Sequence, residues 1–121
     1  MTPQTEQRVM DGYLHVVIDI PRLSVVDMGK LVDQIAVSCA RHNFKKVLLE
    51  NRAPEISGLS TTEMYTVGEH IGSTLVGYRV AYVVQRVLNK ETEFAEIVAI
   101  NRGCNVRFFN DMDQALNWLN T

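Results

Sequence analysis

Short apolar segments alternate with longer segments of helical periodicity along most of this sequence, and this alternation constrains the fold most strongly. Strands that alternate with helices predict a mainly parallel sheet joined by right-handed helical crossovers. The expected strands are the apolar segments 13–20, 47–50, 79–84 and 106–109. The expected helices cover 24–41 and begin again at Ser60, at Asn89 or Thr92, and at Asp111. The sequence therefore predicts an α/β fold with four helices.

A turn close to the N-terminus adds an antiparallel strand. Asp11-Gly12 is the dipeptide typical of a two-residue type I′ hairpin turn, so 7–10 is expected to pair with 13–20. The expected sheet then has about five strands, with one antiparallel edge. With 121 residues the chain has the length of one domain. We assign 9–121 to this single domain and 1–8 to a flexible N-terminus.

The helix that begins at Ser60 combines a strong start signal with two unfavourable residues. Ser60 and Glu63 form a capping-box pattern, in which each side chain accepts a hydrogen bond from the other residue's backbone N–H. Gly68 and Gly72 lie near its apolar edge, and each lowers helix propensity by about 1 kcal/mol relative to alanine. Close packing of this helix on the sheet is the expected reason for both glycines. A partner helix in a homodimer is the alternative.

The third helix is expected to be capped by Asn89 or Thr92. Phe94, Ile97 and Val98 are expected to face inward, and Gly103 is expected to end the helix in a left-handed conformation.

Composition and charge exclude several classes of protein. Twelve Lys and Arg residues against fourteen Asp and Glu residues give a net charge of −2, which argues against a general nucleic-acid binder. No apolar run approaches the length of a membrane span, and the polar N-terminus lacks the apolar segment of a signal peptide. Cys39 and Cys104 lie far apart in the sequence and are expected to be free thiols of a cytoplasmic protein.

Ligands of open parallel sheets bind beyond the carboxyl ends of the strands. The polar residues expected there are Asp19, Glu50, Asn51, Arg52, Gln85, Arg86, Asn110 and Asp111. No glycine-rich nucleotide motif, nucleophile elbow or paired-histidine metal motif occurs, and the three histidines are isolated in the sequence. We therefore expect no catalytic residue, cofactor or metal ion. An enzyme that uses Glu50, Arg52 and Arg86 is kept as an alternative.

The segment 51–62 joins a buried strand to the well-capped helix and is the strongest candidate for binding. Serine and threonine residues gather at the start of the helix, where unpaired N–H groups and the helix dipole favour an anion or a phosphoryl group. Plain capping by Ser60 and Glu63 is the alternative explanation. The expected binding or regulatory loop consists of Glu50, Asn51, Arg52, Glu55, Ser57, Ser60 and Thr61, with Asp19, Arg86 and Asp111 as further contributors.

Several segments resemble a known family. The strand, loop and helix start from Val47 to Leu59 are similar to the segment of STAS domains that ends in Asp-Ser-Ser-Gly-Leu or a close variant. Downstream, the sequence is similar to the SpoIIAA-like branch, also called STAS/SEC14-like. This second likeness rests on Ala-Tyr-Val-Val at 81–84, Asn-Arg-Gly at 101–103 before 106–109, and Ala-Leu-Asn-Trp-Leu at 115–119. The resemblance covers about residues 9–119 and implies a STAS/SpoIIAA-like fold.

The resemblance also implies a function. In phosphoregulated antagonists of this family, the first serine of the motif accepts phosphate from a partner kinase. Here Glu55, Ile56 and Ser57 occupy the places of the Asp and the two serines, so the usual phosphoserine is absent. We expect a non-enzymatic regulatory module, cytoplasmic and bacterial, that binds a regulatory protein partner.

A small carrier of lipid or another apolar ligand is the alternative that the SEC14-like likeness implies. Met64, Tyr65, Tyr78 and Tyr82 are the residues expected to line its cleft beside the sheet. Residues of these types are more often part of an apolar core. Bound lipid would distinguish the two interpretations.

Overall fold

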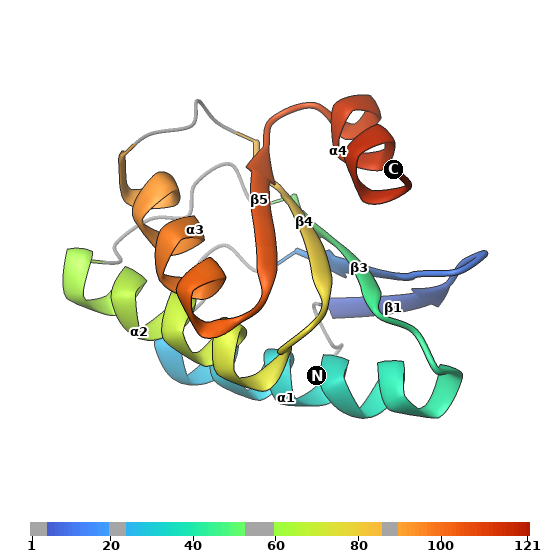
Figure 1. The fold of residues 1–121 in the computed structure, drawn as a ribbon, viewed down its shortest axis with the longest axis horizontal. Helices are drawn as coiled ribbons and strands as arrows, with labels where there is room; N and C mark the ends of the chain where they lie inside the picture. Colours follow the sequence, from blue (N-terminus) through green and yellow to red (C-terminus); the bar gives the residue numbers. More distant parts are fainter. Residues whose placement is uncertain (1–4, 20–23, 53–59, 86–89) are drawn as a thin grey trace.

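A five-stranded mixed sheet organises the chain in the computed structural model, which describes residues 5–19, 24–52, 60–85 and 90–121 (Figure 1). The strands are β1 (Thr5–Val9), β2 (Leu14–Ile18), β3 (Lys46–Asn51), β4 (Arg79–Val83) and β5 (Asn105–Phe109). The helices are α1 (Val25–His42), α2 (Thr61–Thr74), α3 (Lys90–Arg102) and α4 (Met112–Leu119). The strands lie in the order β1-β2-β3-β4-β5, with β1 antiparallel to β2 and the others parallel. The predicted α/β fold is confirmed.

The sequential strand order determines where the helices lie. Each right-handed crossover from β2 to β5 moves one strand in the same direction, so α1, α2 and α3 cover the same face of the sheet. Helix α4 lies on the opposite face, where it packs on β3, β4 and β5 (Figure 1). The strand order never reverses, so this sheet lacks the crevice that forms where adjacent crossovers pass to opposite faces.

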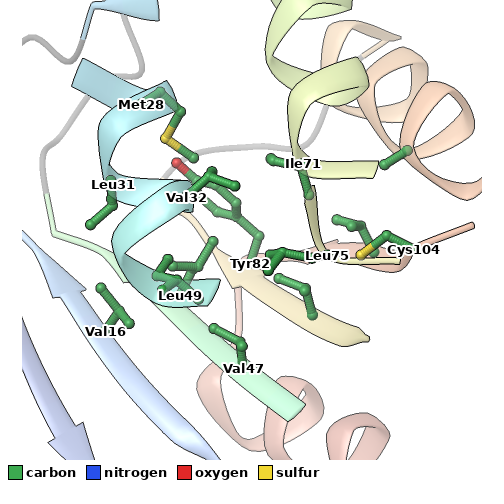
Figure 2. Packing of buried hydrophobic residues seen from close by; sticks show 14 of the residues in the cluster. Val16, Met28, Leu31, Val32, Val47, Leu49, Ile71, Leu75, Tyr82 and Cys104 are labelled. Carbon is green, nitrogen blue, oxygen red and sulfur yellow. The ribbon is translucent and has the colours of Figure 1, made fainter. Parts of the chain in front are cut away.

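The main core fills the space between the sheet and the layer of α1, α2 and α3 (Figure 2). Residues of β2 and β3 such as Val16 and Leu49 point into it and are fully buried. Val32 of α1 and Ile71 of α2 cover them from the helix side. Burial of each such side chain contributes about 1.5–3 kcal/mol, so this face supplies most of the hydrophobic stabilisation.

The predicted helix starts are confirmed at both capping serines. The Ser24 hydroxyl accepts from the backbone N–H of Asp27 at 3.1 Å. Ser60 accepts from the N–H of Glu63 at 3.1 Å, and the Glu63 carboxylate accepts from the N–H of Ser60 at 3.0 Å. The box at Ser60 is therefore complete, and it satisfies donors that a helix start leaves unpaired.

The N-terminal hairpin forms where the sequence predicts it, but two details of the prediction were wrong. Gly12 has a φ of +84° while Asp11 does not have a positive φ, so the turn is not type I′, which requires both. Strand β1 begins at Thr5, so part of the segment expected to be a flexible N-terminus lies in the sheet. An edge strand is held by its backbone ladder and needs no apolar pattern, which explains why the polar residues of β1 gave no signal.

The glycines of α2 pack against α3, not against the sheet. A Cβ on Gly72 would lie 2.5 Å from the Arg102 Cβ and 2.8 Å from the Ala99 carbonyl oxygen. A Cβ on Gly68 would lie 2.9 Å from the carbonyl oxygen of Ala95. The prediction of close packing was right, but the neighbour is the next helix of the same chain.

Of the residues predicted to face inward on α3, Val98 is confirmed and Ile97 was wrong. Ile97 is 56% exposed, while Ala95 and Ala99 are buried beside Val98. The alanines face inward with Val98 because α2 and α3 approach closely, and small residues fit such a contact.

Candidate functional site

Strand alternation separates two neighbouring residues of the expected site onto opposite faces of the sheet. Asn51, 3% exposed, lies on the face that α1, α2 and α3 cover, and its side chain hydrogen-bonds the hydroxyl of Tyr82. Burial raises the pKa of Tyr82 to about 12, although the hydrogen bond from Asn51 opposes this shift. Asn51 therefore satisfies a buried hydroxyl in the core, whereas Glu50 lies on the other face.

Glu50 belongs to a group of charged residues that we call the charged cluster. Its members come from β1, β2 and the end of β3, and they are Glu6, Arg8, His15, Glu50 and Arg52. The Glu50 Oε1 lies 2.8 Å from the His15 Nε2, and Arg52 Nε donates to Glu50 Oε2 at 3.0 Å. Both carboxylate oxygens of Glu50 are thus held by neighbours.

The register of the hairpin brings β1 into the same cluster. Arg8 lies opposite His15 on β2, and Glu6 lies opposite Val17, the neighbour of Glu50. Glu6 and Arg8 form an ion pair of 3.0 Å along the strand. Three adjacent strands therefore present their charges on one side of the sheet.

The electrostatics favour an ionised Glu50. Burial raises its pKa, but the hydrogen bonds from Arg52 and His15 outweigh this effect and hold the pKa below its usual value. Because an ionised carboxylate only accepts hydrogen bonds, His15 donates to it through Nε2–H. A carboxylate held in this way is a poor general acid, since that role needs a raised pKa.

Other residues of the expected site have structural roles or lie elsewhere. Ser60 is an N-cap, and Asp111 caps α4 by accepting from the backbone N–H of Gln114 at 3.0 Å. Asp19 is exposed directly after β2. Glu55, Ser57 and Arg86 lie outside the described residues, as does the side chain of Thr61. Of the expected residues that the structure describes, only Glu50 and Arg52 come together in a polar contact.

The sequence analysis missed His15, Glu6 and Arg8. The signal available for His15 was its place in β2, where it alternates with the core residues Leu14 and Val16 and so lies on the opposite face. Its contact with Glu50 joins residues 35 positions apart and depends on the pairing of β2 with β3. No spacing within the sequence indicates it.

The residues expected to line a lipid cleft are mostly core residues. Met64, Tyr78 and Tyr82 are buried in the main core, and Tyr65 is exposed on α2. A cavity of about 110 Å³ lies between α1 and α2. Its lining consists of Val25, Met28, Gly29, Val32, Thr66, Val67 and His70, and so includes none of those four. This cavity is smaller than typical small-molecule pockets, which have about 300–1,000 Å³.

The cysteines are free and buried. Burial raises the pKa of Cys39 to about 11 and that of Cys104 to about 12. Both thiols therefore stay protonated and unreactive near neutral pH. Within the described residues, no three His, Cys, Asp or Glu side chains lie where they can share a metal ion. No described helix is both long and apolar enough to cross a membrane.

Comparison with known proteins assigns no family to this chain. No protein-family model matches the sequence, and no curated protein matches it. Function is therefore inferred from the geometry of the charged cluster and from the family resemblance of the sequence.

Proposed function

We propose that this chain is a non-enzymatic protein-interaction module that binds its partner through the charged cluster. The observation that carries the proposal is the position of the cluster on the sheet face opposite α1, α2 and α3. The one described helix on that face, α4, packs on β3, β4 and β5. The charged residues come from β1, β2 and the end of β3, whereas the strand contacts given for α4 are with β3, β4 and β5.

The cluster has the properties of a preorganised recognition surface. His15 and Glu50 are only 12% and 14% exposed in their side chains, so their positions are held before a partner arrives. The Arg52 side chain is 46% exposed and uses its Nε to hold Glu50. Its planar group still presents further N–H donors, which suit a partner carboxylate. Interface hot spots are enriched in arginine, and preorganisation lowers the cost of binding.

The family resemblance supports a regulatory partner. STAS-like antagonists act by binding other proteins, and Arg52 lies in the segment 51–62, the strongest candidate for binding in the sequence. The charged cluster and that loop therefore meet at one residue. The proposal includes a cytoplasmic location, which the two free thiols support.

The test compares two arginines of matched exposure, each paired with a glutamate. Arg52 is 46% exposed and pairs with Glu50, while Arg102 on α3 is 45% exposed and pairs with Glu69. We expect Arg52→Ala to weaken capture of the partner from a cell extract by roughly tenfold, a loss typical of an interface arginine. Arg102→Ala should leave capture unchanged.

Two outcomes contradict the proposal. Equal capture by wild type and Arg52→Ala shows that the charged cluster is not the binding surface. Turnover in a hydrolase and transferase screen that Glu50→Gln abolishes shows that the cluster is catalytic, in keeping with the enzyme alternative.

A further inference from the structure

The outer edge of β1 presents unpaired backbone groups in a known order. In an antiparallel pair, residues that bond to the neighbouring strand alternate with residues that point away from it. Met10 N–H donates to the Tyr13 carbonyl at 3.0 Å, which sets this alternation for the hairpin. Glu6 and Arg8 therefore bond to β2, whereas the backbone groups of Thr5, Gln7 and Val9 point outward. Within the described residues, no backbone hydrogen bond to those outward groups is found.

The opposite edge of the sheet is partly covered by a side chain of α3. On β5, the backbone N–H of Phe108 donates to a carboxylate oxygen of Glu96 at 2.6 Å, and α3 carries that carboxylate across the edge. A strand edge closed in this way is a poor template for another strand. One outward N–H of β5 is therefore already bonded, whereas no such bond is found for the outward groups of β1 among the described residues.

We propose that two copies of this chain associate by antiparallel pairing of their β1 strands about a two-fold axis at Gln7. Gln7 then lies opposite Gln7 of the second copy, and Thr5 lies opposite its Val9. These are the residues whose backbone groups point outward, so all of them enter the shared ladder. Glu6 lies opposite Arg8 of the second copy at a position where side chains approach closest.

Charge selects this register over its neighbours. A two-fold axis at Glu6 or at Arg8 places like charges directly opposite each other, which is destabilising. An axis at Val9 places Arg8 opposite Met10, and an axis at Thr5 carries the pairing outside the strand. An axis at Gln7 pairs every residue of β1 and forms two opposite-charge contacts. The edge is self-complementary, as an isologous interface requires.

The edge is also held in place at the centre of the proposed interface. Ser38 of α1 donates a hydrogen bond to the side-chain oxygen of Gln7 at 2.6 Å. This contact fixes β1 against the helix layer and leaves the backbone of Gln7 directed outward. Little order therefore has to be gained on pairing, which favours association.

The symmetry has a consequence for the charged cluster. Two antiparallel strands of one sheet are related by an axis perpendicular to that sheet, so both copies turn the same face in the same direction. The two clusters then join through Glu6 and Arg8 into one surface. This inference does not rest on the proposed function, since the pairing needs no other partner.

Charge reversal tests the register directly. Glu6→Arg makes the strand basic at both positions, and Arg8→Glu makes it acidic at both. In each variant alone, two ion pairs become two like-charge pairs. We therefore expect the dissociation constant of each homodimer to rise roughly tenfold or more relative to wild type. An equimolar mixture should form a heterodimer, because every charged position then faces its opposite. Sedimentation equilibrium of the full chain measures all four samples.

A backbone substitution tests the ladder. Gln7→Pro removes an N–H that points away from β2, so β1 keeps its pairing within the chain. Gln7→Ala is the matched control, because it also loses the contact with Ser38 but retains the N–H. We expect Gln7→Pro to be monomeric and Gln7→Ala to dimerise, with circular dichroism unchanged in both.

The interface is small, so the wild-type chain is expected to dimerise only at about 100 μM and above. A wild-type chain that remains monomeric at about 1 mM overturns the proposal, since even weak pairing is then absent. A dimer that survives both charge reversals also overturns it and points to another surface, such as the exposed Ile97 and Ile100 of α3. If Gln7→Pro fails to fold, the charge-reversal mixture decides.

Discussion

The two faces of the sheet are built from different interactions. The face under α1, α2 and α3 is mainly apolar, with Asn51 paired to Tyr82 among its buried residues. Its helices approach so closely that α2 carries glycine where it meets α3. The other face is divided between the apolar contact of α4 and the charged cluster. Steric packing dominates the first face, and hydrogen-bonded charges dominate half of the second. One face of the sheet is thus specialised for stability, while part of the other face stays available for recognition.

This difference predicts different responses to solution conditions. Close packing does not depend on ionisation, so substitutions on the helix-covered face should cost the same at every pH at which the chain folds. Ion pairs weaken with salt and vanish when a partner loses its charge. Substitutions on the two faces should therefore differ in how much they lower the free energy of unfolding and in how that loss responds to pH and salt.

The largest loss is expected for Gly72→Ala. The new Cβ meets the Arg102 Cβ at 2.5 Å and the Ala99 carbonyl oxygen at 2.8 Å, and overpacking of this kind costs about 2–3 kcal/mol. Gly29→Ala in α1 is the control, because its Cβ would have only His70 atoms at 3.9 Å nearby. It should stabilise the chain by about 0.5–1 kcal/mol through helix propensity. Urea unfolding measures both, and equal effects would contradict the close contact of α2 with α3.

Glu50→Gln should cost about 1.5 kcal/mol near neutral pH, because Arg52 and His15 lose a charged acceptor. The folded chain lowers the pKa of Glu50, so its contribution is complete above the ordinary value of 4.5 and is lost as the pH falls through the folded value. Urea unfolding from neutral to acid pH should therefore show that the free energies of unfolding of wild type and variant converge below pH 4.5. A difference in free energy of unfolding that stays constant with pH would mean that packing, and not charge, stabilises the charged cluster.

Ser60→Ala should cost about 1 kcal/mol, because α2 loses the hydroxyl that accepts from Glu63 N–H. Ser60→Asp should retain stability, since aspartate is a good cap and its charge suits the start of a helix. Thermal unfolding of both variants measures the effect. Unchanged partner capture by Ser60→Asp would show that this serine acts as a cap alone, and a phosphate-sensitive role would then lie elsewhere in the loop.

The smallest loss is expected for Arg52→Ala, at about 0.5 kcal/mol or less, because a half-exposed ion pair contributes little to stability. Arg102→Ala on the helix-covered side should cost a similar amount. Raising the salt concentration should reduce both losses. A much larger loss for Arg52→Ala would assign it a structural role and weaken the case for a recognition surface.

Local signals predicted the order and type of the elements. The alternation of apolar strands with capped helices predicted the parallel sheet, and the hydroxyls of Ser24 and Ser60 mark helix starts to the residue. Gly68 and Gly72 indicated that another part of the protein lies close to this helix. These signals act within a few residues of the chain, through periodicity, capping and backbone preference, and so they can be read without the fold.

Tertiary structure alone decided which of these residues meet. Glu50 joins His15, 35 positions away, while its neighbour Asn51 turns to Tyr82 in the core. The glycines of α2 face α3, although the sequence indicates only that something lies close. A contact between strands depends on register, and a shift of one residue moves every side chain to the other face. Register is set by the packing of the whole core, which no short segment of this sequence contains.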